Sequence, residues 1–186
     1  MRPTKWQTQK VNGRDAVLLD IEKRSGVYNK TILQDVRAVM NDYEVDMYRL
    51  VMNIGKRYGM NTAYEIMSDT VAEKRLKWLD QVKAELELNG SEVANGLCLY
   101  LKYFSPKSTD FILVEQTIER VVFKRKDFVN AISHACSVLG LDVIEVNNKV
   151  YARAMNVLFK NVGLSLEHVF LAYQDGWYDE MIEDVS

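Results

Sequence analysis

The stretch that decides the fold reads Asp110-Phe111-Ile112-Leu113-Val114-Glu115-Gln116, then Ile118-Glu119-Arg120-Val121-Val122-Phe123-Lys124-Arg125. Both runs are dense in β-branched and aromatic residues, which favour strands. In the second run, residues 120, 122 and 124 alternate with Val121, Phe123 and Arg125, giving a strand with two faces. The period then becomes helical between Asp127, a candidate N-cap, and Gly140, a candidate stop, with an apolar face of Phe128, Ala131, Ile132, Ala135, Cys136 and Leu139.

The chain before this stretch has helical periodicity. Apolar residues at three- and four-residue spacing predict helices from Thr31 to Met40, Tyr43 to Tyr58, Thr62 to Leu86, and Ser91 to Phe104. Gly59 should end the second helix, and Thr62 with Glu65 has the spacing of a capping box for the third. Residues 15–105 are therefore expected to be helical, after a flexible arm at residues 1–14.

The chain after it predicts a helix and a hairpin. Asn147 or Asn148 can cap a helix that reaches Asn161. Leu164 to Tyr173 alternates as a strand, and Gln174-Asp175-Gly176 indicates a turn into a second strand, Trp177 to Glu183. We therefore expect a single α+β domain at residues 15–186, in which a helical N-terminal half packs on a small antiparallel sheet with two further helices.

Composition excludes several classes of function. The 186 residues are 48% hydrophobic and 27% charged, with a net charge of −2, which is typical of a globular protein and gives no reason to expect nucleic acid. No apolar run suits a membrane span, and the polar start lacks a signal-peptide core. Cys98 and Cys136 lie in helical stripes, so we expect two buried, reduced thiols and a cytoplasmic protein. The two histidines and two cysteines lack the paired spacing of a metal site, so we expect no metal. The sequence also contains no glycine-rich phosphate loop, so we expect no cofactor.

The layout of the C-terminal half resembles a known family. A strand ending in Val121-x-Phe123-x-Arg125, a helix with Ala131 and a final Gly140, a second helix and a last hairpin look like the L-2-amino-thiazoline-4-carboxylate hydrolase family. The helix from Tyr48 to Tyr58, followed by the long charged helix, is similar to a distant branch of it. The resemblance covers roughly Tyr43 to the C-terminus and implies a hydrolase-like α+β protein.

The chain departs from this family at its cysteines. The family commonly has Cys-Pro where Lys126-Asp127 stand here, a cysteine where this chain has only Leu141 to Val146, and another near the last hairpin, where Asp175-Gly176-Trp177-Tyr178 stand. The resemblance therefore implies hydrolysis, while these residues oppose it.

Arg125 and His168 are the main candidates for ligand binding. Arg125 ends a strand just before a helix, where it could hold a small carboxylate, although a surface ion pair with Asp127 is the simpler interpretation. His168 shares a strand face with apolar residues, which suggests a core histidine bonded to a main-chain carbonyl or a polar group in an apolar pocket. In the second case Tyr151 or Tyr173 should lie nearby.

Other polar groups have simpler interpretations. His134 and Cys136 are two positions apart on a helix, so they point in different directions and cannot form a nucleophile pair. The acidic residues Asp179, Glu180, Glu183 and Asp184 suggest a solvated edge strand. Tyr100 and Tyr103 lie off the main stripe of their helix, and with the other tyrosines and methionines they make a homodimer through the helical half plausible.

These observations support three functions. The first is a small-molecule-binding protein with an apolar pocket between sheet and helices, which takes an apolar or small carboxylate ligand and has reduced or no catalysis. The second is an active hydrolase of a small cyclic amide or amidine carboxylate, with Arg125 holding the carboxylate and His168 as base. The third is a non-enzymatic assembly or sensor protein that dimerises through its helical half. We take the first as the prediction, with catalytic residues unknown.

Overall fold

The computed structural model describes residues 28–82, 90–103, 110–127 and 131–186. The chain divides into two compact units, residues 1–40 and 41–186, and the second contains the whole sheet and the helices that pack on it. The predicted arm at residues 1–14 lies outside the described residues. Within those residues, no helix is long and apolar enough to cross a membrane.

The second unit is built on a four-stranded antiparallel sheet, so the predicted α+β class is confirmed. Its strands are β1 (Phe111–Gln116), β2 (Arg120–Lys126), β3 (Leu166–Gln174) and β4 (Trp177–Asp184). Their order is β1-β2-β4-β3, so β4 pairs with strands on both sides. Both predicted hairpins are confirmed, the second turning at Asp175 and Gly176, which have positive φ values of 53° and 81°.

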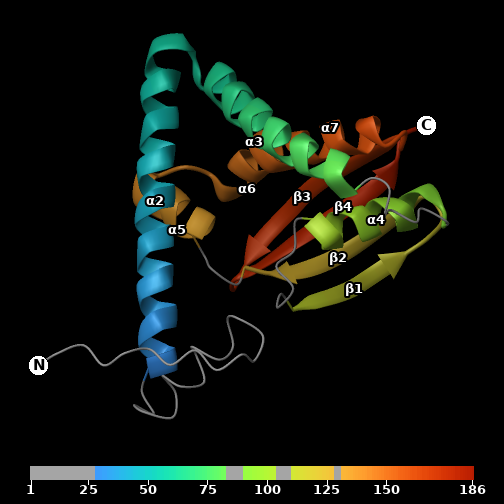
Figure 1. Ribbon diagram of the computed structural model, residues 1–186, viewed down its shortest axis with the longest axis horizontal. Coiled ribbons are helices and arrows are strands. Elements are labelled where there is room, and N and C mark those ends of the chain that lie inside the picture. Colours follow the sequence, from blue (N-terminus) through green and yellow to red (C-terminus); the bar gives the residue numbers. More distant parts are fainter. Residues whose placement is uncertain (1–27, 83–89, 104–109, 128–130) are drawn as a thin grey trace, which may run out of the picture. The chain divides into compact units, whose positions relative to one another are not determined.

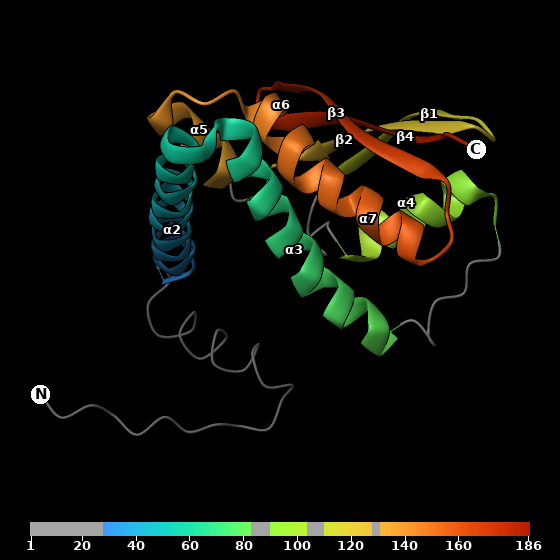
Figure 2. The same ribbon diagram turned by 90° about the horizontal axis from the view of Figure 1, so that it is seen from above.

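Helices cover one face of this sheet (Figures 1 and 2). They are α4 (Glu92–Tyr103) and one continuous helix built from α6 (Val143–Val146), the π-helical turn η2 (Asn147–Ala152) and α7 (Arg153–Asn161). Helix α3 (Met60–Val82) packs against η2 and α7. Between α4, α7 and the sheet lies a core that includes Leu99, Phe123, Phe159 and Ile182.

A close helix–sheet approach sets the position of α4. A Cβ atom at Gly96 would overlap the Leu166 Cδ1 atom, so only glycine fits there without displacement. Tyr100 lies one turn further along α4 and is 1% exposed, so it faces the same core. Ser91 caps the helix, since its Oγ accepts a hydrogen bond from the Ala94 N–H at 3.4 Å.

Several element boundaries differ from the predictions. The two helices predicted between Thr31 and Tyr58 are one helix, α2 (Tyr28–Tyr58), which ends at Gly59 with φ 91°. Helix α3 begins at Met60, so Thr62 and Glu65 lie inside it and form no capping box. The last helix begins earlier, capped by Asp142, so Asn147 and Asn148 are interior residues. Other predictions involve residues 83–89, 104–109 and 128–130, which lie outside the described residues. They are the helix ends at Leu86 and Phe104, the place of Phe128 on an apolar helix face, and the helix start that Asp127 should cap.

Candidate functional site

A buried carboxylate lies at the centre of the sheet's inner face. Glu180 on β4 is 0% exposed and shares this face with Tyr178 and Ile182. The prediction of a solvated acidic edge strand is wrong, because β4 is central and its alternation turns Glu180 inward. The signal was present in the sequence: Glu180 stands two residues from an apolar neighbour on either side.

Three polar side chains from three elements bond to Glu180. Arg125 on β2 donates from Nε to Glu180 Oε1 at 2.8 Å. Tyr100 on α4 donates from its hydroxyl to Glu180 Oε2 at 2.5 Å, and the Nε2 atom of His168 on β3 lies 2.9 Å from the same oxygen. Because an ionised carboxylate only accepts hydrogen bonds, Nε2 carries the hydrogen in this arrangement.

Electrostatics favour a charged Arg125 and a neutral Tyr100 in this cluster. Burial alone would lower the pKa of Arg125, but the adjacent Tyr100 and Glu180 outweigh it and raise that pKa above its ordinary value. Burial, followed by the charge of Glu180, raises the pKa of Tyr100 well above its ordinary value. Arg125 is therefore a cation and Tyr100 a neutral hydroxyl donor at neutral pH.

His168 has a polar atom left over. Its ring is buried and packs at 4.8 Å from the rings of both Tyr100 and Phe170. Its Nδ1 atom is buried and has no hydrogen-bond partner among the described residues. With hydrogen on Nε2, the Nδ1 atom of a neutral imidazole is an acceptor. Buried polar atoms are normally paired, and Nδ1 is one of several buried side-chain polar atoms without a hydrogen-bond partner among the described residues.

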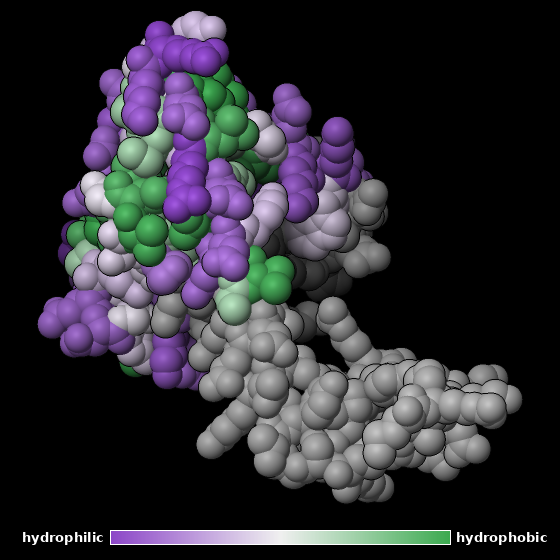
Figure 3. All heavy atoms as spheres, turned by 90° about the vertical axis from the view of Figure 1, so that its left-hand side faces the viewer, coloured by the Kyte–Doolittle hydropathy of each residue, from purple (hydrophilic) through white to green (hydrophobic). Residues whose placement is uncertain are grey.

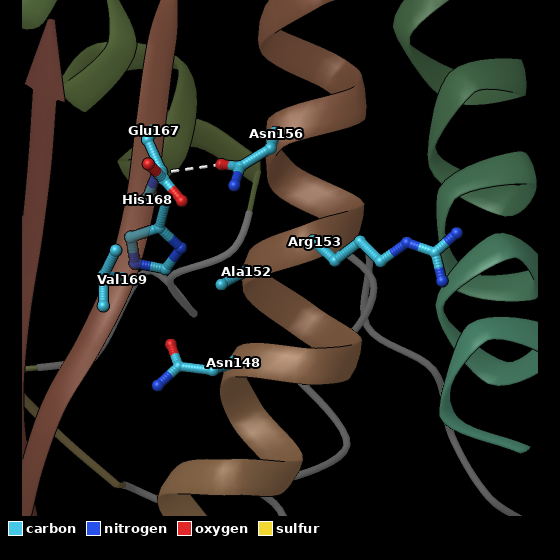
Figure 4. Close-up of a pocket in the computed structure, with 7 residues that line it drawn as sticks. All are labelled: Asn148, Ala152, Arg153, Asn156, Glu167, His168 and Val169. Atoms are coloured by element: carbon cyan, nitrogen blue, oxygen red, sulfur yellow. Dashed lines mark hydrogen bonds between the residues drawn. The ribbon is translucent and has the colours of Figure 1, made fainter. Parts of the chain in front are cut away.

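His168 also lines a cavity between β3 and the η2–α7 helix. Its volume is about 320 Å³, and its lining residues are Asn148, Ala152, Arg153, Asn156, Glu167, His168 and Val169. Figure 4 shows Asn148, Ala152 and Asn156 on the side of the helix that faces the strand, with the His168 ring opposite Ala152. The Arg153 side chain points away, and its guanidinium pairs with Asp69 at 3.3 Å.

The two asparagines cover the free edge of β3. Asn148 accepts from the Phe170 N–H at 2.8 Å and donates to the Phe170 carbonyl at 2.9 Å. Asn156 accepts from the His168 N–H at 2.8 Å. Asn148 and Asn156 are eight residues apart. In a regular α-helix, which turns by about 100° per residue, their side chains would point in directions roughly 80° apart. The wider turn of η2 removes most of this offset, so both amides reach the same strand.

The structure joins two of the four predicted site residues. Arg125 and His168 meet through Glu180, which the sequence prediction missed. The simpler interpretations of both are wrong: Arg125 is largely buried and pairs with Glu180, and the His168 ring bonds to Glu180 rather than to a carbonyl. Arg125 does not line the cavity that His168 lines.

The predicted tyrosines lie outside this cluster. Tyr151 on η2 accepts a hydrogen bond from the Tyr48 hydroxyl at 3.1 Å. Burial lowers the pKa of the nearby Arg75 to about 10, and Tyr151 partly offsets this effect. Tyr173 packs on Tyr178 with ring centroids 4.6 Å apart. A bulge between Phe170 and Ala172 places Tyr173 opposite Tyr178, although strict alternation had put it on the other face from His168.

Of the remaining sequence predictions, some are confirmed and others are wrong. His134 is exposed and Cys136 buried, as predicted. Cys98 is exposed, so the expectation of two buried thiols is wrong for this one. Tyr100, predicted off the main stripe, is a core residue of the cluster. Within the described residues, no three His, Cys, Asp or Glu side chains gather as metal ligands.

Comparison with known proteins identifies no family. No family model and no curated protein matches the chain. A solved structure similar to it is an Fe(II) unliganded H-NOX protein mutant from K. algicida, with a TM-score of 0.42 and 12% identity over 91% of this chain and 92% of that one. A likeness at this TM-score does not establish a shared fold.

Proposed function

We propose that this chain binds a small molecule between β3 and the η2–α7 helix, with His168 as its anchoring group. The observation that carries the proposal is the buried Nδ1 atom of His168, an acceptor without a partner among the described residues. Its other ring nitrogen is held by Glu180, which fixes the ring and the tautomer. The group to be recognised is therefore a hydrogen-bond donor, an N–H or O–H.

The size and lining of the cavity support this proposal. A volume of about 320 Å³ is within the range of small-molecule sites. Its lining mixes apolar Ala152 and Val169 with polar groups, so it suits a compact polar ligand better than a hydrocarbon. Arg125 acts through Glu180 in this proposal: it pairs with the carboxylate that holds the His168 ring, and it does not hold a ligand carboxylate itself.

The hydrolase that the family resemblance implies is a second candidate. An imidazole whose second nitrogen bonds to a carboxylate has the arrangement of a general base and its orienting group. No nucleophilic side chain bonds to His168 among the described residues, so a hydrolase of this design would activate water. We favour binding alone, because the cavity lined by His168 does not include Arg125.

A ligand screen with matched variants tests the binding proposal. The terminal amide of glutamine can reproduce the Nε2 donor of histidine but offers no acceptor at the Nδ1 position. Compounds from a fragment library that raise the melting temperature of the native protein should lose their effect in His168→Gln and keep it in the exposed control His134→Gln. A library with no active compound, or compounds equally active on His168→Gln, would refute the proposal.

We also propose that the chain self-associates through its helical half and works in a reducing compartment such as the cytoplasm. Several large apolar residues of α2 are exposed, among them Tyr43, Leu50 and Tyr58, which supports self-association. Cys98 and Cys136 are both free, and an exposed thiol such as Cys98 persists best under reducing conditions.

A further inference from the structure

Helix α2 carries apolar residues on two adjoining faces, whose centres are about 120° apart at about 100° per residue. One face is buried within the second unit and includes Val45, Tyr48 and Val51. On the other face, Tyr43, Leu50 and Tyr58 are 65%, 60% and 69% exposed. Figure 3 looks onto the side of the molecule where α2 lies and shows apolar side chains interrupting its polar surface. A helix that is apolar on two faces is typically covered on both.

The exposed face has the spacing of a helix–helix seam. Tyr43, Met47, Leu50 and Ile54 follow one another at intervals of four, three and four, and Tyr58 comes four residues later. The first four residues alternate as the a and d positions of a coiled coil do, and Tyr58 lies one residue beyond the next such position. Met47 and Ile54 are half-buried, because they also pack against the core that contains Tyr48, and they flank Leu50 at the middle of the series. We call these five residues the outer stripe.

The charges at the two ends of the segment that carries the outer stripe distinguish the two possible orientations. The start of this segment carries Asp42 and Asp46, and its last turn carries Lys56 and Arg57. All four are exposed. Two parallel copies would bring like charges together at both ends. Two antiparallel copies would bring the acidic end of each helix against the basic end of the other, which is favourable.

We propose that two copies of this chain associate through antiparallel α2 helices, with Leu50 at the twofold axis. This inference rests on the proposed self-association and names its surface and orientation. A twofold axis near Leu50 places Tyr43 opposite Tyr58 of the second copy, and Met47 opposite its Ile54, so the outer stripe meets itself along its whole length. Such a self-complementary patch is what a twofold dimer requires.

Disulfide trapping tests the orientation in the full-length chain, with the exposed Cys98 changed to serine. Leu50→Cys should form a cross-linked dimer with itself. Tyr43→Cys alone should not, because its two copies would lie roughly 22 Å apart, at about 1.5 Å per residue over the fifteen residues to position 58. Tyr43→Cys mixed with Tyr58→Cys should cross-link. Efficient self-cross-linking of Tyr43→Cys would indicate parallel helices and overturn the proposal.

Sedimentation equilibrium tests the surface and separates this proposal from the broader one. The native chain should be a dimer, and Leu50→Glu should raise its dissociation constant by about a hundredfold or more, because two carboxylates would face each other in an apolar seam. Tyr43→Glu should act in the same direction. Ile112→Glu, an exposed apolar site on the sheet, is the matched control and should stay dimeric. A monomeric native chain would refute self-association altogether, whereas a dimer unaffected by Leu50→Glu would refute only the α2 interface.

Discussion

Replacement of Arg125 by methionine should be strongly destabilising. The side chain of Arg125 is 13% exposed and that of Glu180 0%, and their Nε and Oε1 atoms are 2.8 Å apart. Methionine fills a similar volume but leaves the carboxylate buried without its counter-charge, which typically costs about 3–5 kcal/mol. That loss is a large part of the roughly 5–15 kcal/mol that stabilises a typical domain. Urea unfolding at pH 7, followed by circular dichroism, measures the change.

The same strand provides a control with the same geometry. Arg120 pairs with Glu115 at 2.8 Å, but these side chains are 51% and 40% exposed. Arg120→Met should therefore cost less than about 1 kcal/mol. Adding Glu180→Gln to Arg125→Met removes the buried charge and should recover part of the lost stability. If Arg125→Met cost no more than Arg120→Met, the argument that Arg125 compensates a buried charge would be wrong.

Three further predictions concern stability. Gly96→Ala should cost about 1–3 kcal/mol in urea unfolding, because the new methyl group overlaps Leu166; no change would mean that α4 is free to move away from the sheet. Burial raises the pKa of Cys136 to about 12, so its contribution to stability is complete below about pH 9 and is lost as the pH rises toward 12. Cys136→Ala should reduce the fall in stability between pH 9 and 10.5 by up to about 1.4 kcal/mol per pH unit, and an unchanged pH profile would contradict this. Asn148→Ala should cost about 1–2 kcal/mol by uncovering two main-chain groups of β3, whereas Asn161→Ala, which removes one exposed hydrogen bond within a helix, should change little.

Periodicity was sufficient to predict the architecture. The alternation in residues 110–125 and 164–183 predicts four strands, and the turn residues Asp175 and Gly176 predict the second hairpin. Strand order was harder to predict, because charged residues on the outer face of β4 resemble an edge strand. Charge on one face of a strand indicates only that this face is solvated, and it does not show whether neighbours pair on both sides.

The site depended on features that local patterns do not contain. The sequence prediction missed Glu180 because other acidic residues stand beside it. Its position two residues from both Tyr178 and Ile182 nevertheless places it on the inner face. The bulge after Phe170 and the wider turn of η2 each change the direction of the side chains beyond them. Both depart from regular geometry, so strict periods of 2 and 3.6 residues could not place Tyr173 or align Asn148 with the strand.

The central position of β4 has a consequence for the order in which the polypeptide can fold during synthesis. A ribosome delivers the chain from its N-terminus, so Tyr100, Arg125 and His168 all emerge before Glu180. Until residues 177–184 have left the exit tunnel, β2 and β3 have no strand between them, and three polar side chains lack their common acceptor. The inner face can therefore be completed only once β4 is available to pair with both neighbours.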